Sequence, residues 1–232
     1  MQGIKALTFD TGGTILDWHS GIKRALAAAG GRRGVTADWT AVTNEFRKRA
    51  LGGIVNTIGQ RYNFDDVHRA ELDKLLRERG IDVLTAEDRE AVMRSLYELD
   101  AWPDFVAGLD RLRSKFPCVS FTLLTTALVI AVSRRNGILW DAVISCEMLG
   151  IYKVRPEAYQ GAAKLLQLKP SEILMVACHN FDLDAARGQG FKTCFVRRPD
   201  EWGPPGPPDP TPNPGCDLVV DTFPELADRL GC

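Results

Sequence analysis

The sequence predicts an α/β fold, a doubly wound, Rossmann-like parallel sheet that a helical insertion interrupts after the first strand. Three observations support this fold class. A short apolar run ends at Asp10, residues 20 to about 95 show only helical periodicity, and apolar runs alternate with helical patterns over the rest of the chain. Strands that alternate with helices favour a parallel sheet covered on both faces.

The helical insertion is expected to contain four amphipathic helices. The first ends at a glycine, the second places Trp39, Val42 and Phe46 on one face, and the last begins with Thr85 as a cap followed by acids. These helices are expected within residues 17–30, 36–54, 64–80 and 85–102.

Strands and helices alternate after the insertion. Strands are expected within residues 119–126, 141–149, 172–178, 192–198 and at the start of 217–230. Helices are expected within residues 101–116, 156–168, 179–190 and at the end of 217–230. Residues 198–215 are rich in proline, which excludes helix and ladder, so we expect a stiff surface loop and not a recognition motif.

Length and composition limit the possible classes of protein. The 232 residues suffice for one large domain or two small ones, and the formal net charge of −1 gives no reason to expect a nucleic-acid partner. No apolar run reaches about 18 residues, so no membrane partner is expected. The chain runs at once into a core strand, which leaves no room for a signal peptide and predicts a cytoplasmic protein.

The six cysteines are scattered without C-x-x-C spacing. This spacing does not support zinc ligation, because structural zinc sites need closely paired thiolates. Cys178 and three others lie in or beside apolar runs and are expected to be small buried hydrophobes with free thiols.

Polar residues follow four of the expected strands or their connections. In open parallel sheets the site lies at the carboxyl ends of the strands. This rule brings together Asp10, the pair Thr125 and Thr126, the stretch "YKVRPEAY" and the stretch "CHNFDLD".

Each of these residues has a structural and a chemical interpretation. Asp10 before "TGGT" could form an Asx turn, or it could be a carboxylate nucleophile beside glycine amides that bind an oxyanion. Thr125 and Thr126 could be caps or donors to an anionic substrate. Lys153 could be a solvated charge, or it could keep Asp10 ionised and attract an anion.

The acids after the strand within residues 172–178 are also open to two interpretations. One of Asp182 and Asp184 could cap the next helix, and the other could orient a water molecule or fix Lys153.

The motifs "FDTGGTILD", "LLTT", "IYKVRPEAY" and "MVACHNFDLDAARGQGF" resemble, in order and spacing, those of the haloacid dehalogenase (HAD) superfamily. The resemblance covers nearly the whole chain and is greatest to the type II, inverting 2-haloacid dehalogenases. It implies a Rossmann-like HAD core at residues 1–16 and 97–232 and an inserted helical cap domain at residues 17–96.

The resemblance implies a hydrolase that converts short 2-haloalkanoic acids to 2-hydroxy acids without a cofactor or metal. Asp10 would displace the halide with inversion and form an aspartyl ester, which water then hydrolyses. Lys153 matches the family's lysine, Asp182 matches the acid that helps to activate water, and Thr14 would hold the nucleophile loop.

Arg47 resembles the family's halide acceptor, because it follows Phe46 in a cap helix. The alternative is that it belongs to a solvated helix face with Lys48 and Arg49. The resemblance also implies a set of substrate-binding residues, namely Thr11, Thr125, Thr126, Tyr159, His179 and Asn180. The implied partner is a small 2-haloacid, and a homodimer is expected from the family.

Several positions depart from the family's pattern. Gly12 replaces an aromatic residue of the dehalogenases and the second aspartate of the superfamily's phosphatases, Thr126 replaces an amide and Ala177 a serine. His179 stands in place of an asparagine and could donate to the nucleophile, act as a base, or be held by backbone.

Two other functions stay open. One is a magnesium-dependent phosphatase that uses Asp10 with Asp182 or Asp184, which Gly12 disfavours because it cannot protonate a leaving alcohol. The other is a non-catalytic binding protein that keeps the fold, since fold alone does not fix function.

Overall fold

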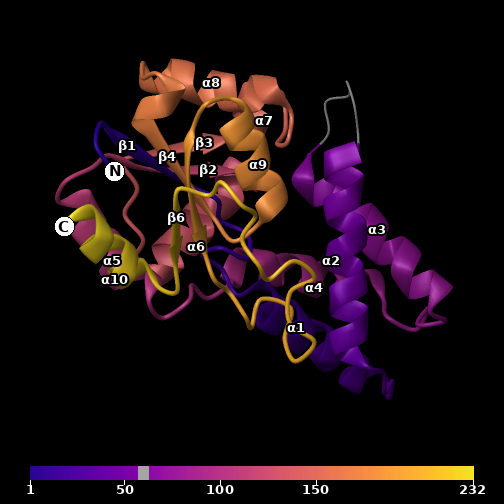
Figure 1. Ribbon diagram of the computed structural model, residues 1–232. Helices are drawn as coiled ribbons and strands as arrows, with labels where there is room; N and C mark the ends of the chain where they lie inside the picture. The colour runs from indigo at the N-terminus through magenta and orange to yellow at the C-terminus, as the bar shows by residue number, and fades with distance from the viewer. Residues whose placement is uncertain (57–62) are drawn as a thin grey trace.

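The computed structural model describes residues 1–56 and 63–232 (Figure 1). These residues form a six-stranded sheet in the order β3-β2-β1-β4-β5-β6, and every neighbouring pair is parallel. The strands are β1 (Ala6–Phe9), β2 (Cys118–Thr122), β3 (Ala142–Ser145), β4 (Ile173–Ala177), β5 (Lys192–Val196) and β6 (Leu218–Val220). The predicted α/β class with a doubly wound parallel sheet is confirmed.

The first four helices of the described residues and a 3₁₀ turn follow β1. They are α1 (Trp18–Arg32), α2 (Trp39–Asn56), α3 (Phe64–Glu78), α4 (Ala86–Ser95) and the turn Leu96–Glu98. Residues 57–62, which belong to the predicted helical region, lie outside the described part of the chain. The division into a core and a cap domain at residues 16 and 97 stays a prediction.

The remaining helices are α5 (Phe105–Arg113), α6 (Thr126–Asn136), α7 (Cys146–Leu149), α8 (Pro156–Leu166), α9 (Asn180–Gly188) and α10 (Phe223–Leu230). The first of them, α5, precedes β2, and the others follow β2 or a later strand. The expected strand within residues 141–149 is shorter than predicted, because the Ser145 side chain accepts a hydrogen bond from the Glu147 N–H and starts α7.

Both faces of the sheet are covered, as the pattern of aromatic contacts shows. Phe9 of β1 packs against Phe105 of α5 and Phe223 of α10, and α5 and α10 lie side by side (Figure 1). Phe121 of β2 packs against Tyr159 of α8 on the opposite face. Successive strand residues point to opposite faces, and the register Phe9–Ser120 therefore places Phe9 and Phe121 on different sides.

The order of the strands determines where a site can form. From β1 the chain proceeds to β2 and β3 on one side, and it then crosses to β4 on the other side of β1. The carboxyl ends of β1 and β4 therefore face a crevice at the point where the winding direction changes. Within the described residues, no helix is long and apolar enough to span a membrane.

Candidate active site

Asp10 lies directly after β1, at this crevice, with its side chain almost fully buried. Its Oδ2 accepts a hydrogen bond from the Thr14 hydroxyl at 2.8 Å and lies 3.2 Å from His179 Nδ1. Its Oδ1 lies 3.3 Å from the Lys153 ammonium. Burial alone would raise the pKa of Asp10, but Lys153, His179 and Thr14 together hold it well below the ordinary value, so the carboxylate is ionised.

Lys153 is buried between two carboxylates. Its Nζ donates to Asp182 Oδ2 at 2.7 Å, and it also stands 4.6 Å from the centre of the Phe121 ring. Burial acts to lower the pKa of Lys153, but the charges of Asp182 and Asp10 outweigh it and raise that pKa. Lys153 is therefore a fixed ammonium inside the protein and not a solvated surface charge.

Asp182 lies in the first turn of α9 and is held by two donors. Besides Lys153, the Tyr159 hydroxyl donates to Asp182 Oδ1 at 2.6 Å. Burial raises the pKa of Asp182 above its ordinary value, although Lys153 opposes this shift. Asp184 points elsewhere, because its carboxylate accepts from Arg187 and from Asn213.

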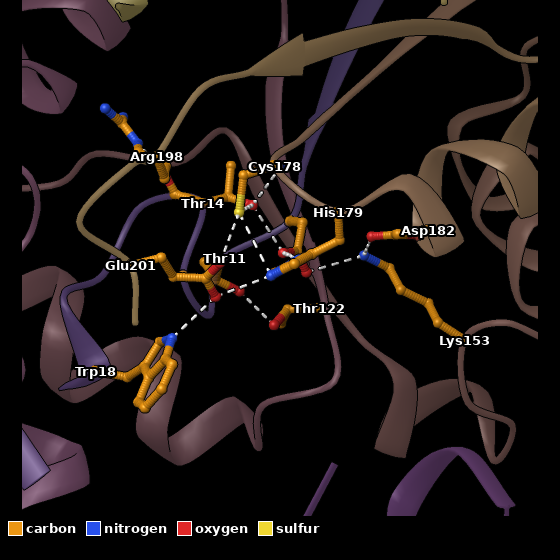
Figure 2. A network of polar contacts seen from close by, with 12 residues as sticks. Thr11, Thr14, Trp18, Thr122, Lys153, Cys178, His179, Asp182, Arg198 and Glu201 are labelled. Carbon is orange, nitrogen blue, oxygen red and sulfur yellow. Dashed lines mark hydrogen bonds and ion pairs between the residues drawn. The ribbon is translucent and has the colours of Figure 1, made fainter. Parts of the chain in front are cut away.

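His179 links Asp10 to a second buried acid. Its Nε2 lies 2.9 Å from Glu201 Oε1, and the Trp18 indole N–H donates to the same oxygen at 2.9 Å (Figure 2). Burial lowers the pKa of His179, but the neighbouring thiol of Cys178 and the Glu201 carboxylate raise it well above its ordinary value. The imidazole is therefore charged while Asp10 is ionised.

Glu201 belongs to the proline-rich segment, and its position corrects one prediction. Residues 198–215 were expected to form a surface loop, but Glu201 and Trp202 are buried, with Glu201 only 2% exposed. The segment is held over the site by Asn180, whose side chain donates to the Thr211 carbonyl and accepts from the Asn213 N–H. Prolines exclude regular structure, but they do not prevent a loop from packing inward.

Arg47 projects from α2 into the same crevice and is 8% exposed. Among the described residues no carboxylate lies within ion-pair distance of its guanidinium, and its Nε has no hydrogen-bond partner. The guanidinium lies 5.4 Å from the Trp18 ring centre. The charges of Glu201 and Asp10 act on it from beyond ion-pair distance, and a buried cation without a close ion pair is costly, so an anion beside this guanidinium would be stabilised.

Gly12 makes room for this arginine. A Cβ atom at position 12 would lie 3.2 Å from an Arg47 terminal nitrogen and 3.9 Å from Leu124. A larger side chain would therefore displace the guanidinium. The glycine in place of an acid or an aromatic residue fits the buried position of Arg47.

Two neighbouring cavities lie at the site. The inner one, about 20 Å³, is lined by Asp10, Thr122, Lys153 and other residues, and the outer one has about 390 Å³. Arg47 and His179 line both cavities, so the outer cavity lies directly beside the one that contains Asp10.

Four of the six predicted substrate-binding residues lie outside the lining of these cavities, namely Thr11, Thr125, Thr126 and Tyr159, whereas His179 lines both cavities and Asn180 lines the outer one. The Thr125 hydroxyl caps α6 by accepting from the Leu128 N–H, and the Thr126 N–H donates to Glu147. Thr122, at the end of β2, lines the inner cavity instead, and its hydroxyl is hydrogen bonded to Thr11. The strand ends at Thr122, four residues before the end that "LLTT" suggested, and the threonine pair therefore lies at the start of α6.

Sequence reasoning missed Thr122, Glu201 and Trp18. For Thr122 a signal existed, because it is the last residue of the apolar run that pairs with β1. For Glu201 the local sequence gave no such signal, because this residue reaches the site only through the tertiary contacts of the proline-rich segment. Trp18 was assigned only to the first helix of the insertion.

The residues at this site do not fit Mg²⁺. Magnesium prefers oxygen ligands gathered around one position. Here the Lys153 ammonium occupies the space between Asp10 and Asp182, and Asp184 pairs with Arg187. No second acid stands at Gly12, so the oxygen ligands required by the phosphatase alternative are missing.

Comparison with known proteins gives consistent similarities. A family model described as haloacid dehalogenase-like hydrolase matches residues 4–188. An (S)-2-haloacid dehalogenase of Pseudomonas sp. (strain YL) is 30% identical, with 85% of this chain and 84% of that protein covered. (S)-2-haloacid dehalogenase 4A of Burkholderia cepacia is 29% identical, with 85% of each chain covered.

Solved structures agree with these sequence similarities. The crystal structure of a defluorinating L-2-haloacid dehalogenase has a TM-score of 0.91 and 32% identity, covering 99% of this chain and 96% of that one. That of another L-2-haloacid dehalogenase has a TM-score of 0.90 and 31% identity, covering 99% of both chains.

Proposed function

This chain belongs to the haloacid dehalogenase-like hydrolase family, and we propose that it hydrolyses short 2-haloalkanoic acids to 2-hydroxy acids through an aspartyl ester on Asp10. One observation carries the proposal. An ionised, buried carboxylate lines the same inner cavity as a buried guanidinium that forms no ion pair with any residue the structure describes. Nucleophilic displacement of a halide needs these two groups, an electron-pair donor and an acceptor for the departing anion.

The first step is attack by Asp10 on the carbon that carries the halogen. Oδ2 already accepts from Thr14 and faces His179, whereas Oδ1 faces only Lys153. We therefore assign Oδ1 as the attacking atom. The new carbon–oxygen bond forms as the carbon–halogen bond breaks, and the halide leaves with the bonding electrons toward Arg47.

The second step is hydrolysis of the ester by water. Forming the ester removes the negative charge of Asp10, which is one of the causes that raise the pKa of His179. The imidazolium then releases its Nδ1 proton to solvent, and Nδ1 becomes the base that takes a proton from the attacking water, while Glu201 holds the other ring nitrogen. On the other side of Asp10, the ion pair with Asp182 holds the Lys153 ammonium in place beside the nucleophile.

Hydrolysis restores the enzyme with all atoms accounted for. Water adds to the Asp10 carbonyl carbon, and collapse of this adduct breaks the bond between that carbon and the ester oxygen. The product alkoxide takes a proton from His179, and the new Asp10 carboxyl group gives the second proton of the water to His179, which restores the ionised carboxylate and the charged imidazole. The product hydroxyl oxygen therefore comes from Asp10, and the water oxygen stays in the new carboxylate.

The experiment is halide release, measured by ion chromatography, from chloroacetate and from each enantiomer of 2-chloropropionate in buffer with EDTA. The wild type is expected to release halide, and Asp10→Ala is expected to release none. Asp184→Asn is a matched control, since this acid lies two residues from Asp182 but pairs with Arg187.

A single turnover in ¹⁸O-labelled water tests the ester. Label is expected in Asp10 and not in the first equivalent of product. Phosphate-ester hydrolysis that requires magnesium, without halide release, would overturn the proposal in favour of the phosphatase. The absence of both activities would favour a binding protein.

A further inference from the structure

On the edge of the His179 ring that faces away from Asp10, Nε2 lies close to the Cys178 thiol and to the Glu201 carboxylate. Among residues 1–56 and 63–232, Cys178, His179 and Glu201 are the group of metal-binding side chains whose ligand atoms all lie within 4.8 Å of one another. Cys178 Sγ is 3.4 Å from His179 Nε2 and 3.7 Å from Glu201 Oε2, and Nε2 is 2.9 Å from Glu201 Oε1. The three residues come from the end of β4 and from the proline-rich segment.

We propose that Cys178, His179 and Glu201 form a binding site for Zn²⁺ or a similar borderline-soft divalent cation. Zinc binds thiolate, imidazole and carboxylate ligands at about 2.0–2.3 Å in tetrahedral sites, which places two ligand atoms roughly 3.3–3.8 Å apart. The separation of Sγ from Nε2 and that of Sγ from Glu201 Oε2 lie in this range, whereas Nε2 contacts the other carboxylate oxygen, Oε1, at 2.9 Å. The Glu201 carboxylate therefore has to turn slightly to offer one oxygen to the ion. The set is unlike the oxygen ligands that Mg²⁺ requires.

Each of the three ligands has a partner that fixes its orientation. His179 Nδ1 lies 3.2 Å from Asp10 Oδ2, the carboxylate–histidine arrangement that is common behind metal-bound imidazoles. The Trp18 N–H donates to Glu201 Oε1, and the Thr14 hydroxyl lies 3.4 Å from Cys178 Sγ (Figure 2). The trio is therefore positioned by a second layer of contacts, which lowers the cost of ordering it around an ion.

An ion has access to this position and room for a further ligand. All three side chains line the outer cavity of about 390 Å³, so water can supply the fourth ligand from that side. On binding, the thiol loses its proton and His179 Nε2 loses its proton, and both protons go to solvent. Thiolate and carboxylate then balance the two charges of the cation.

Zinc binding and the proposed hydrolysis exclude each other. The metal would occupy His179 Nε2 and take Glu201 away from it, which leaves no base for hydrolysis of the ester. Zinc is therefore expected to inhibit the enzyme reversibly. This inhibition rests on the proposed function, whereas the binding site itself does not.

Binding is tested first with Co²⁺ and then with Zn²⁺ on the full-length, metal-free, reduced protein. Co²⁺ is expected to bind with a one-to-one stoichiometry and to give a thiolate-to-cobalt absorption band in the near ultraviolet, which Zn²⁺ then removes by displacement. Cys178→Ala should abolish the band, and Glu201→Gln should weaken Zn²⁺ binding at least tenfold in calorimetry. Cys232→Ser, a partly buried thiol near the chain end, is the control and should bind as the wild type does.

The wild-type spectrum alone decides the question if a variant fails to fold. Absence of the thiolate band in the wild type, or an unchanged band in folded Cys178→Ala, would overturn the site.

Halide release provides the second readout, in which each protein is compared with its own metal-free activity. Inhibition by Zn²⁺ that EDTA reverses is expected in the wild type and in Cys232→Ser. Zinc binding without any dehalogenase activity would leave the metal site standing and overturn only the proposed function.

Discussion

Replacing Lys153 with methionine removes the charge that separates two buried carboxylates. The ammonium lies 3.3 Å from Asp10 and 2.7 Å from Asp182, and the side chain is 1% exposed. At an effective dielectric constant of about 20, each pair attracts by roughly 5–6 kcal/mol before the desolvation cost is subtracted. Removing one partner of a buried pair typically costs about 3–5 kcal/mol, so Lys153→Met is expected to lower the free energy of unfolding by that amount at pH 7.

The loss is expected to depend on pH in a defined direction. In the wild type, Lys153 lowers the pKa of Asp10 in the folded protein. The resulting stabilisation of the fold is fully present above the ordinary carboxyl pKa, and it is lost as the pH falls through the lowered pKa of folded Asp10. In the variant, burial without the ammonium raises the pKa of both carboxyl groups, which favours the fold only while they are protonated. The difference between the two proteins should therefore grow with pH from the lowered pKa of Asp10 in the wild type up to the raised pKa values in the variant, and it should be smaller at pH 4.5 than at pH 7.

Urea unfolding followed by fluorescence at pH 4.5 and pH 7 measures this difference. Lys5→Met is the matched control, because Lys5 is also 2.7 Å from a carboxylate, that of Glu172, but its side chain is 60% exposed. An exposed pair contributes about 0–1 kcal/mol, so the control should change little. A loss below about 1 kcal/mol in Lys153→Met, with no dependence on pH, would refute the reasoning.

Three further predictions concern the site. Arg47→Met should lower kcat/KM for halide release about 100-fold, because it removes the donor to the departing anion. The control Arg49→Met, at a partly exposed neighbouring arginine, should leave kcat/KM unchanged. Equal losses in the two variants would contradict a role of Arg47 in binding the halide. Glu201→Gln should slow ester hydrolysis more than ester formation, so mass spectrometry should detect a covalent adduct on the protein during turnover, and its absence would count against the His179–Glu201 pair as the base. Gly13→Ala should destabilise the protein by about 1–3 kcal/mol in urea unfolding, because residue 13 has a φ of 92° and a Cβ there would lie 2.1 Å from Glu201 Oε1; a wild-type midpoint would show that the loop relaxes freely.

The fold and one half of the site were predictable from local sequence. Asp10 stands at the end of an apolar strand, and Lys153 and Asp182 belong to motifs whose spacing brings them to the same sheet edge. The structure brings these three side chains into direct contact. Strand ends are set by backbone pairing over short distances, which hydrophobic patterns describe well.

The other half depended on tertiary contacts. Glu201 reaches His179 only because the loop after β5 folds back and is held by Asn180, and composition identified that loop as an exposed one. Thr125 and Thr126 were misplaced because β2 ends at Thr122, four residues before the predicted end, so the Thr122 hydroxyl faces the cavity and the Thr125 hydroxyl caps the helix. Element boundaries are where local patterns contain the least information.

The site joins parts of the chain that the ribosome makes at very different times. Asp10 is synthesised near the beginning, β4 has to insert beside β1, and Glu201 follows only after β5. Until then His179 has no carboxylate partner and the outer cavity has no wall from the proline-rich segment. Contacts this distant in sequence form late in folding, because the loop entropy between them has to be overcome first. Under the proposed function, a nascent chain that has not reached Glu201 is expected to contain Asp10 without the His179–Glu201 pair that would hydrolyse the ester.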